Sequence, residues 1–198
     1  MIYVDLDDVI GESSRMFLRV LERQFSKKVL YEQLVTFDLA VSCGLNKKQY
    51  AELMTLIHSR ERLLEIEPVF GATRALARWA SEGYEIAIVT GRPDNTREAT
   101  EEWLARYQVI HHSLIMIDKY GRSSQSGTRM ASLDALADRS FSAAVEDSLE
   151  TASYLAQMLG IMVALPDRPW NQSDPEYDKV IRCHSWDDIS EVVRCPGT

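Results

Sequence analysis

The chain has 198 residues, 45% of them hydrophobic and 26% charged, a composition typical of a folded domain with an apolar core. Its formal net charge of −8 argues against nucleic-acid polymers and anionic membranes as partners. A small anion can still bind where local positive charge or a metal ion overrides this net charge.

The first residues predict an apolar strand, and they lack the basic segment followed by an apolar segment that is typical of a secretion signal. No run of about 18 apolar residues predicts a membrane span. Cys43, Cys183 and Cys195 are odd in number and far apart, as is typical of free thiols in a reducing compartment. These features together predict a cytoplasmic protein.

Apolar strands and helices alternate along most of the chain. Continuous apolar segments predict strands over residues 1–4, 86–90, 113–117, 141–147, 161–165 and 179–183. Helical spacing and capping residues predict helices over residues 71–85, 94–107, 128–138, 149–160 and 185–193. Because such strands form parallel sheets covered on both faces, we predict an α/β, Rossmann-like fold.

Residues 14–67 interrupt the alternation, since they contain only helical patterns. One helix is expected from about residue 13 to 25, with Ser13 or Ser14 as its N-cap, and another over residues 47–64. Ligands of open α/β sheets bind outside the carboxyl ends of the strands, so a segment that leaves after the first strand would cover the site. We therefore predict a helical cap over 14–67, inserted into a core formed by 1–13 and 68–198.

An acidic segment, DLDDV, directly follows the first strand. Asp5 and Asp7 lie two positions apart and so point to the same face, whereas Asp8 points elsewhere and shapes the loop. Two converging carboxylates without a basic neighbour suit a hard divalent cation, Mg²⁺ above all. The alternative is a solvated acidic loop, because short motifs also occur by accident.

Two further strands end in residues that suit phosphate. Thr90 and Gly91 provide a hydroxyl group and an unobstructed backbone N–H. Lys119 follows the third strand and is a compact positive charge, with Arg129 as the competing cation. Taken singly, these residues are also compatible with an ordinary turn and an exposed lysine.

The strand over 141–147 ends in Glu146 and Asp147. Asp147 is a candidate metal ligand or a helix N-cap, and the pattern leaves the role of Glu146 open. Because parallel strands end at one edge of a sheet, the four strand ends predict a single site. Their acids, hydroxyl and lysine suit phosphoryl transfer, in which catalysis is mostly positioning and charge neutralisation.

In this order, DLDDV, VTGR, Lys119 and VEDS resemble the four motifs of the haloacid dehalogenase-like (HAD) phosphohydrolases, and the resemblance runs through the whole chain. LPDRPWN and HSWDDI resemble segments of the 5'(3')-deoxyribonucleotidases and their bacterial relatives. The resemblance implies a HAD-like core with a small cap, and hydrolysis of (deoxy)nucleoside monophosphates. A second aspartate after the first indicates phosphatase and not dehalogenase chemistry.

The resemblance also implies residue roles. Asp5 would be the nucleophile that forms an aspartyl-phosphate, and Asp7 the general acid and base, protonated near neutral pH while Asp5 stays ionised. Mg²⁺ would be held by the Asp5 carboxylate, the Asp7 backbone carbonyl and Asp147. The phosphoryl oxygens would be held by Thr90, Gly91 and Lys119.

Substrate choice is expected to depend on the cap. Phe37 is the candidate to stack on a base, with Leu39 and Ile57 as apolar neighbours and Trp170 as a further lining residue; the alternative for each is packing. The chain has Thr-Gly-Arg-Pro from Thr90 onward, where the nucleotidases that it resembles carry Thr-Ser-Pro. A sugar phosphate or phosphoglycolate is therefore an alternative substrate.

Among other classes, a Mg²⁺-dependent receiver-like switch is the main rival, but the chain lacks a phospho-accepting aspartate on a middle strand before Thr90. The expected partner is a small phosphomonoester. The sequence does not determine the oligomeric state, and a homodimer is one possibility.

Overall fold

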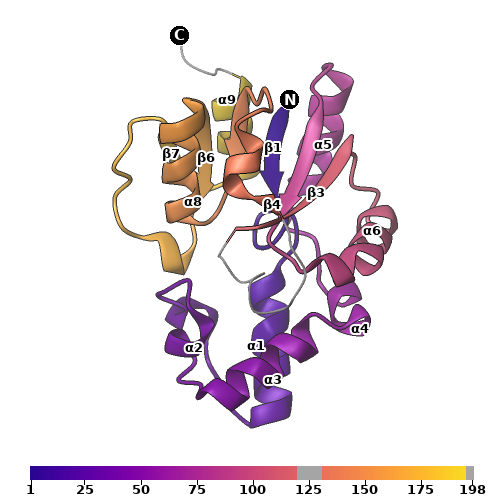
Figure 1. Cartoon of the computed structure of the whole chain (residues 1–198), viewed down its shortest axis with the longest axis vertical. Coiled ribbons are helices and arrows are strands. Elements are labelled where there is room, and N and C mark those ends of the chain that lie inside the picture. The colour runs from indigo at the N-terminus through magenta and orange to yellow at the C-terminus, as the bar shows by residue number, and fades with distance from the viewer. Residues whose placement is uncertain (120–130, 195–198) are drawn as a thin grey trace.

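A seven-stranded sheet forms the centre of the computed structural model, which describes residues 1–119 and 131–194 (Figure 1). Within these ranges the strand order is β4-β3-β2-β1-β5-β6-β7, and each neighbouring pair is parallel. The strands are β1 (Ile2–Asp5), β2 (Ile86–Thr90), β3 (Ser113–Asp118), β4 (Ala131–Ser132), β5 (Ala143–Val145), β6 (Met162–Pro166) and β7 (Val180–Cys183). The chain order reverses between β1 and β5, and in open α/β sheets such a switch point is where ligands bind.

Both faces of the sheet are buried, which explains the continuous apolar strands. Along β1, Ile2 and Val4 belong to one buried cluster and Tyr3 belongs to another. Helices α5 (Ala72–Ser81), α6 (Arg97–Arg106) and α9 (Trp186–Arg194) contribute to the first cluster. Helix α8 (Leu149–Tyr154) contributes to the second, so the predicted α/β fold with helices on both faces is confirmed.

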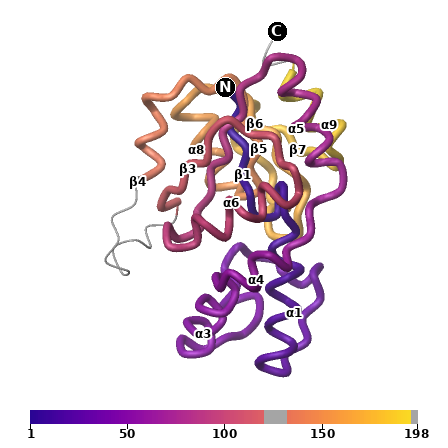
Figure 2. Tube along the Cα trace, turned by 90° about the vertical axis from the view of Figure 1, so that its right-hand side faces the viewer, coloured from indigo at the N-terminus to yellow at the C-terminus, as the bar shows by residue number. Residues whose placement is uncertain are grey.

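Four α-helices and one short 3-10 helix, Tyr31–Gln33, lie between β1 and α5, at the end of the molecule toward which the carboxyl end of β1 points (Figure 2). The α-helices are α1 (Ser13–Phe25), α2 (Leu39–Ser42), α3 (Lys47–Ile57) and α4 (Arg60–Leu64). We call residues 13–64 the helical segment. Its role as a cap stays a prediction.

The helical segment differs in detail from the expectation. The helix predicted over 47–64 is broken at His58, and Ser59 caps a new helix by accepting a hydrogen bond from the Arg62 N–H. Neither Ser13 nor Ser14 is the N-cap of α1; both lie in its first turn. Instead the Asp8 carboxylate accepts hydrogen bonds from the Ser14 N–H (3.0 Å) and hydroxyl (2.6 Å).

The prediction of a helix over residues 128–138 is wrong for the part of this range that the structure describes. Ala131 and Ser132 form β4, which pairs with the end of β3, and Leu133–Leu136 is a 3-10 helix. Pairing with a neighbouring strand outweighs helical propensity here, a tertiary effect that local spacing does not reveal.

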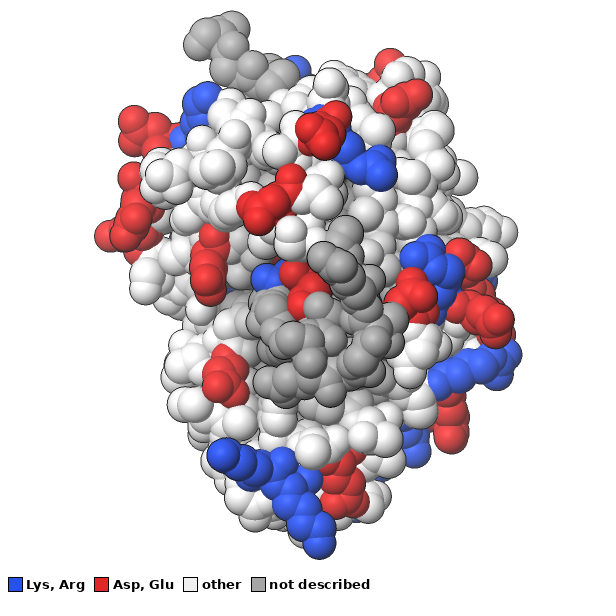
Figure 3. Space-filling model, in the orientation of Figure 1, with Lys and Arg blue, Asp and Glu red and all other residues white. Residues whose placement is uncertain are grey.

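No helix in the described ranges is long and apolar enough to cross a bilayer. Cys43 and Cys183 are buried free thiols, and Cys195 lies outside the described residues. Acidic and basic side chains are interspersed over the face shown in Figure 3.

Candidate active site

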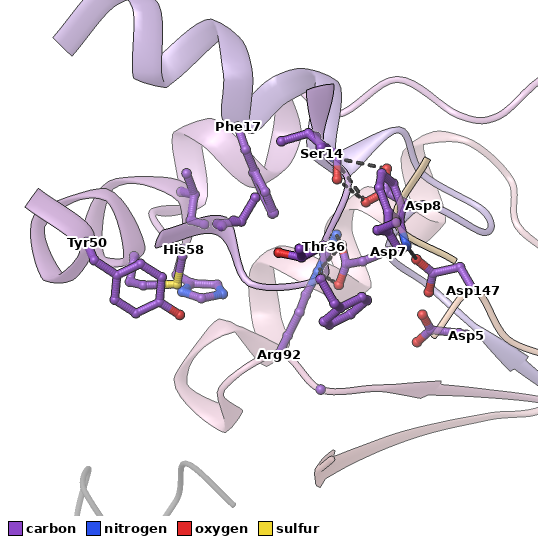
Figure 4. A pocket seen from close by; sticks show the side chains of 17 residues that line it. Asp5, Asp7, Asp8, Ser14, Phe17, Thr36, Tyr50, His58, Arg92 and Asp147 are labelled. Carbon is purple, nitrogen blue, oxygen red and sulfur yellow. Dashed lines mark hydrogen bonds and ion pairs between the residues drawn. The ribbon is translucent and has the colours of Figure 1, made fainter. Parts of the chain in front are cut away.

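A cavity lies between the carboxyl ends of the central strands and the helical segment (Figure 4). The strand side is largely charged and contributes Asp5, Asp7, Asp8, Gly91, Arg92, Asp147 and Trp170. The helical segment contributes a mainly apolar wall formed by Ser14, Phe17, Leu34, Thr36, Phe37, Leu39, Tyr50, Met54, Ile57 and His58. The cavity thus joins an ionic end to an apolar end.

Asp5 ends β1 and is almost completely buried. The Lys119 ammonium donates a hydrogen bond to its Oδ1 at 2.6 Å. Burial raises the pKa of Asp5 to about 8, although the charge of Lys119 acts in the opposite direction. Asp5 is therefore ionised at neutral pH only if a further positive charge lies close to its carboxylate.

Three buried acids can supply ligands for such a charge. Carboxylate oxygens of Asp5, Glu146 and Asp147 all lie within 4.8 Å of one another. Burial, and then the charges of Asp5 and Glu146, raise the pKa of Asp147 well above its usual value. A set of oxygen ligands with excess negative charge fits a hard divalent cation such as Mg²⁺. Of the acids predicted to hold metal, Asp5 and Asp147 lie in this cluster, and Glu146 is its third member.

Residues in the segment after β6 hold Asp147 in place by hydrogen bonds. The Trp170 indole N–H donates to its Oδ2 at 2.9 Å, and the Asn171 side chain donates to its backbone carbonyl at 2.8 Å. Trp170 also contacts the Tyr31 ring edge-on, with 5.7 Å between centroids. Trp170 therefore links the helical segment to a candidate metal ligand.

Asp7 makes contacts that the sequence did not reveal. Arg92 donates two hydrogen bonds to the Asp7 carboxylate, from Nη2 to Oδ1 at 2.6 Å and from Nε to Oδ2 at 3.0 Å. Ser13 donates a further hydrogen bond to Asp7. Burial alone would raise the pKa of Asp7, but the Arg92 guanidinium outweighs it and holds the pKa below its usual value. The expectation that Asp7 holds a proton near neutral pH while Asp5 stays ionised refers to a site with metal bound to Asp5, and it stays a prediction.

Arg92 is itself buried, with only 2% of its side chain exposed. It donates a further hydrogen bond to the Thr100 hydroxyl at 3.3 Å. A basic residue two positions after a strand end was the only signal in the sequence, and it did not distinguish an exposed arginine from one that faces the site. His58, which lines the cavity, was also missed, because nothing in the local pattern singled it out.

The predicted phosphate residues lie near the acids. Thr90 is buried at the end of β2 and its hydroxyl accepts a hydrogen bond from the Arg92 N–H at 3.2 Å. Gly91 lines the cavity and Lys119 contacts Asp5. Arg129, the alternative cation, lies outside the described residues.

The residues nominated for substrate choice all line the cavity: Phe37, Leu39, Ile57 and Trp170. Phe37 is 40% exposed, whereas Ile57 is 1% exposed and belongs to the core. Tyr50 adds an aromatic ring that the sequence did not single out.

Comparisons with known proteins give a family match. The family described as "5' nucleotidase, deoxy (Pyrimidine), cytosolic type C protein" matches residues 1–123, more than half of the chain. A candidate nucleotidase of Halalkalibacterium halodurans is 23% identical over 190 residues, which cover 96% of this chain and 90% of that protein.

Solved structures share the fold at low identity. A HAD family hydrolase of Deinococcus radiodurans with bound phosphate and sodium superposes with a TM-score of 0.62 at 14% identity, covering 97% of this chain and 96% of that chain. Protein tyrosine kinase A of Mycobacterium tuberculosis gives a TM-score of 0.69 at 14% identity, with 97% and 96% covered. Both share the fold of this chain over nearly its whole length.

Proposed function

Because the chain belongs to the family of cytosolic type C 5' nucleotidases within the HAD superfamily, we propose that it hydrolyses deoxynucleoside monophosphates with Mg²⁺ through an aspartyl-phosphate. That it is a phosphomonoester hydrolase follows from the family. The Mg²⁺ requirement, the covalent step and the substrate are our proposal. The family description also supports the predicted cytoplasmic location.

One observation carries the proposal. The Asp5 carboxylate lines the cavity, contacts the Lys119 ammonium at 2.6 Å and lies within 4.8 Å of two further buried acids. A nucleophile, a cation and a metal-binding set of oxygens therefore meet at one point. Phosphoryl transfer requires these groups, because it depends on positioning and on neutralising the phosphoryl oxygens.

In this mechanism Asp5 attacks phosphorus, the bond to the leaving oxygen breaks, and an acyl phosphate forms on Asp5. Lys119, the Thr90 hydroxyl and the Gly91 N–H hold the phosphoryl oxygens. Bound Mg²⁺, held by Asp5, the Asp7 backbone carbonyl and Asp147, with Glu146 nearby, would neutralise charge on the carboxylates and the phosphate. Water then hydrolyses the acyl phosphate and regenerates Asp5.

Asp7 acts on protons in both steps. It gives a proton to the leaving oxygen and later takes one from the attacking water. The contact with Arg92 favours the ionised form, which is the form that the second step needs. For the first step the contact must loosen as the substrate enters, so that Asp7 can take up a proton.

We propose that residues 14–67 act as the cap and select the leaving group. Phe37 and its neighbours on the apolar wall would hold a nucleobase, with the phosphate at the ionic end of the cavity. The alternative is a sugar phosphate or phosphoglycolate. It is favoured by Arg92, a buried cation in the cavity, which belongs to the Thr-Gly-Arg-Pro segment where the nucleotidases that the sequence resembles carry Thr-Ser-Pro.

A panel of phosphomonoesters tests the proposal. Phosphate release from deoxynucleoside 5'- and 3'-monophosphates, sugar phosphates, phosphoglycolate and p-nitrophenyl phosphate is measured with Mg²⁺ and with EDTA. We expect the highest kcat/KM for a deoxynucleoside monophosphate and no turnover with EDTA. Preference for phosphoglycolate or a sugar phosphate would support the alternative, and phosphorylation without release would indicate a switch.

A further inference from the structure

Tyr3 lies on β1 two residues before Asp5, so both side chains point to the same face of the sheet. Its register neighbours are Ala87 on β2 and Ala144 on β5, whose small side chains leave room for a ring. The fully buried ring contacts Phe141 edge-on, with 5.8 Å between centroids. Core packing accounts for this ring but not for its hydroxyl group.

The Tyr3 hydroxyl donates a hydrogen bond of 2.7 Å to Oε2 of Glu146, which is also fully buried. A phenylalanine would fill the same space without the cost of burying a polar group. Oε2 of Glu146 also accepts from the Lys119 ammonium at 2.7 Å, and Oε1 accepts from the Ser148 N–H at 3.1 Å. Glu146 is therefore held by three donors.

Lys119 stands between two carboxylates, 2.6 Å from Asp5 and 2.7 Å from Glu146, with no part of its side chain exposed. Its ammonium also lies 5.2 Å from the centroid of the Tyr3 ring. The two carboxylates compete for this one ammonium. The hydrogen bond from the Tyr3 hydroxyl stabilises part of the negative charge on Glu146. The attraction of Glu146 for the Lys119 ammonium is then weaker, and the ammonium stays close to Asp5.

We propose that Tyr3 is a positioning residue of the phosphate site, which acts through Glu146 to hold the Lys119 ammonium beside Asp5. This inference rests on the proposed function, in which Asp5 is the nucleophile and Lys119 binds phosphate. It also assigns Glu146 a role that does not depend on metal: Glu146 anchors the lysine.

Tyr3→Phe tests the proposal, since it keeps the ring and removes only the hydroxyl. Tyr3→Leu also removes the ring face beneath the ammonium. Phe141→Leu is the matched control, because it disturbs the packing of the same ring without touching Glu146. For each protein, inorganic phosphate is titrated by calorimetry at saturating Mg²⁺. The kcat and KM for p-nitrophenyl phosphate and the Tm are also measured.

We expect Tyr3→Phe to weaken phosphate binding and lower kcat/KM about tenfold, the effect of one lost hydrogen bond to a charged group. Tyr3→Leu should weaken both further. Phe141→Leu should lower the Tm and leave the phosphate Kd unchanged.

A Tyr3→Phe protein with a lower Tm but wild-type phosphate Kd and kcat/KM would overturn the inference and leave Tyr3 a core residue. Equal losses of phosphate affinity in Tyr3→Phe and Phe141→Leu would overturn it as well. Wild-type protein that binds no phosphate and hydrolyses no monoester would instead refute the proposed function.

Discussion

Removal of Arg92 should expose how much the buried ion pair with Asp7 contributes to folding. The Arg92 side chain is 2% exposed and that of Asp7 is 29% exposed, so each loses most of its water on folding. Removing one partner of a fully buried pair costs about 3–5 kcal/mol, because the other charge stays buried without compensation. Arg92→Met should cost less than this, about 2 kcal/mol, since Asp7 keeps some contact with water.

The measurement is a double-mutant cycle with Arg92→Met, Asp7→Asn and the double variant, each unfolded in urea. Asp7→Asn leaves the guanidinium buried and should cost about 3 kcal/mol. The double variant should be more stable than the sum of the single changes predicts, with a coupling free energy of about 2 kcal/mol. Circular dichroism and tryptophan fluorescence must give the same transition for these free energies to be defined.

The pair formed by Arg60 and Glu102 is the matched control. It has the same 2.6 Å separation, but its side chains are 66% and 44% exposed. Exposed pairs couple by about 0.2–1 kcal/mol. A coupling at Arg92 no larger than the coupling at this surface pair would refute the reasoning, because burial would then add nothing.

Other changes test the site and the fold. Asp5→Asn should abolish turnover of p-nitrophenyl phosphate and the acid-stable labelling of the protein by phosphate; residual turnover would exclude the covalent step. Lys119→Met should weaken the phosphate Kd, measured by calorimetry, far more than Arg129→Met, and the reverse order would transfer the role to Arg129. Trp170→Phe removes the N–H donor to a metal ligand and should weaken Mg²⁺ binding, followed by calorimetry, by about 10–100-fold, whereas unchanged affinity would make Trp170 a packing residue. The N–H groups of the residues before α9 lower the pKa of Asp188 in the folded state, so Asp188→Asn should reduce the Tm at neutral pH; the difference from wild type should disappear as the pH falls through that pKa, and a constant difference would exclude the charge effect.

The strands and the site edge were predictable because both depend on local patterns. Continuous apolar segments indicated buried strands, and polar residues directly after them had to meet at one edge of a parallel sheet. Carboxylate oxygens of Asp5, the last residue of β1, and of Asp147, two residues after β5, do lie within 4.8 Å of each other in the structure. Lys119, at the end of β3, reaches the same point.

The partners of Asp7 and Glu146 were not predictable, since they depend on side-chain directions. Arg92 follows a strand end, where a side chain can turn toward solvent or toward the site, and the spacing does not decide between them. In the structure it turns inward to Asp7. Likewise, β4 forms because it pairs with β3, a contact across the chain that outweighs a helical pattern.

The sequence by itself determined the α/β architecture, the position of the helical segment after β1, and the residue types at the strand ends. These follow from hydrophobic periodicity and from the geometry of parallel strands. Only the tertiary structure decided how the charges pair: Asp7 with Arg92, Asp5 and Glu146 with Lys119, and Glu146 with Tyr3. The physical reason is that a buried charge must find a partner, and which partner it finds depends on distances that no one-dimensional pattern contains.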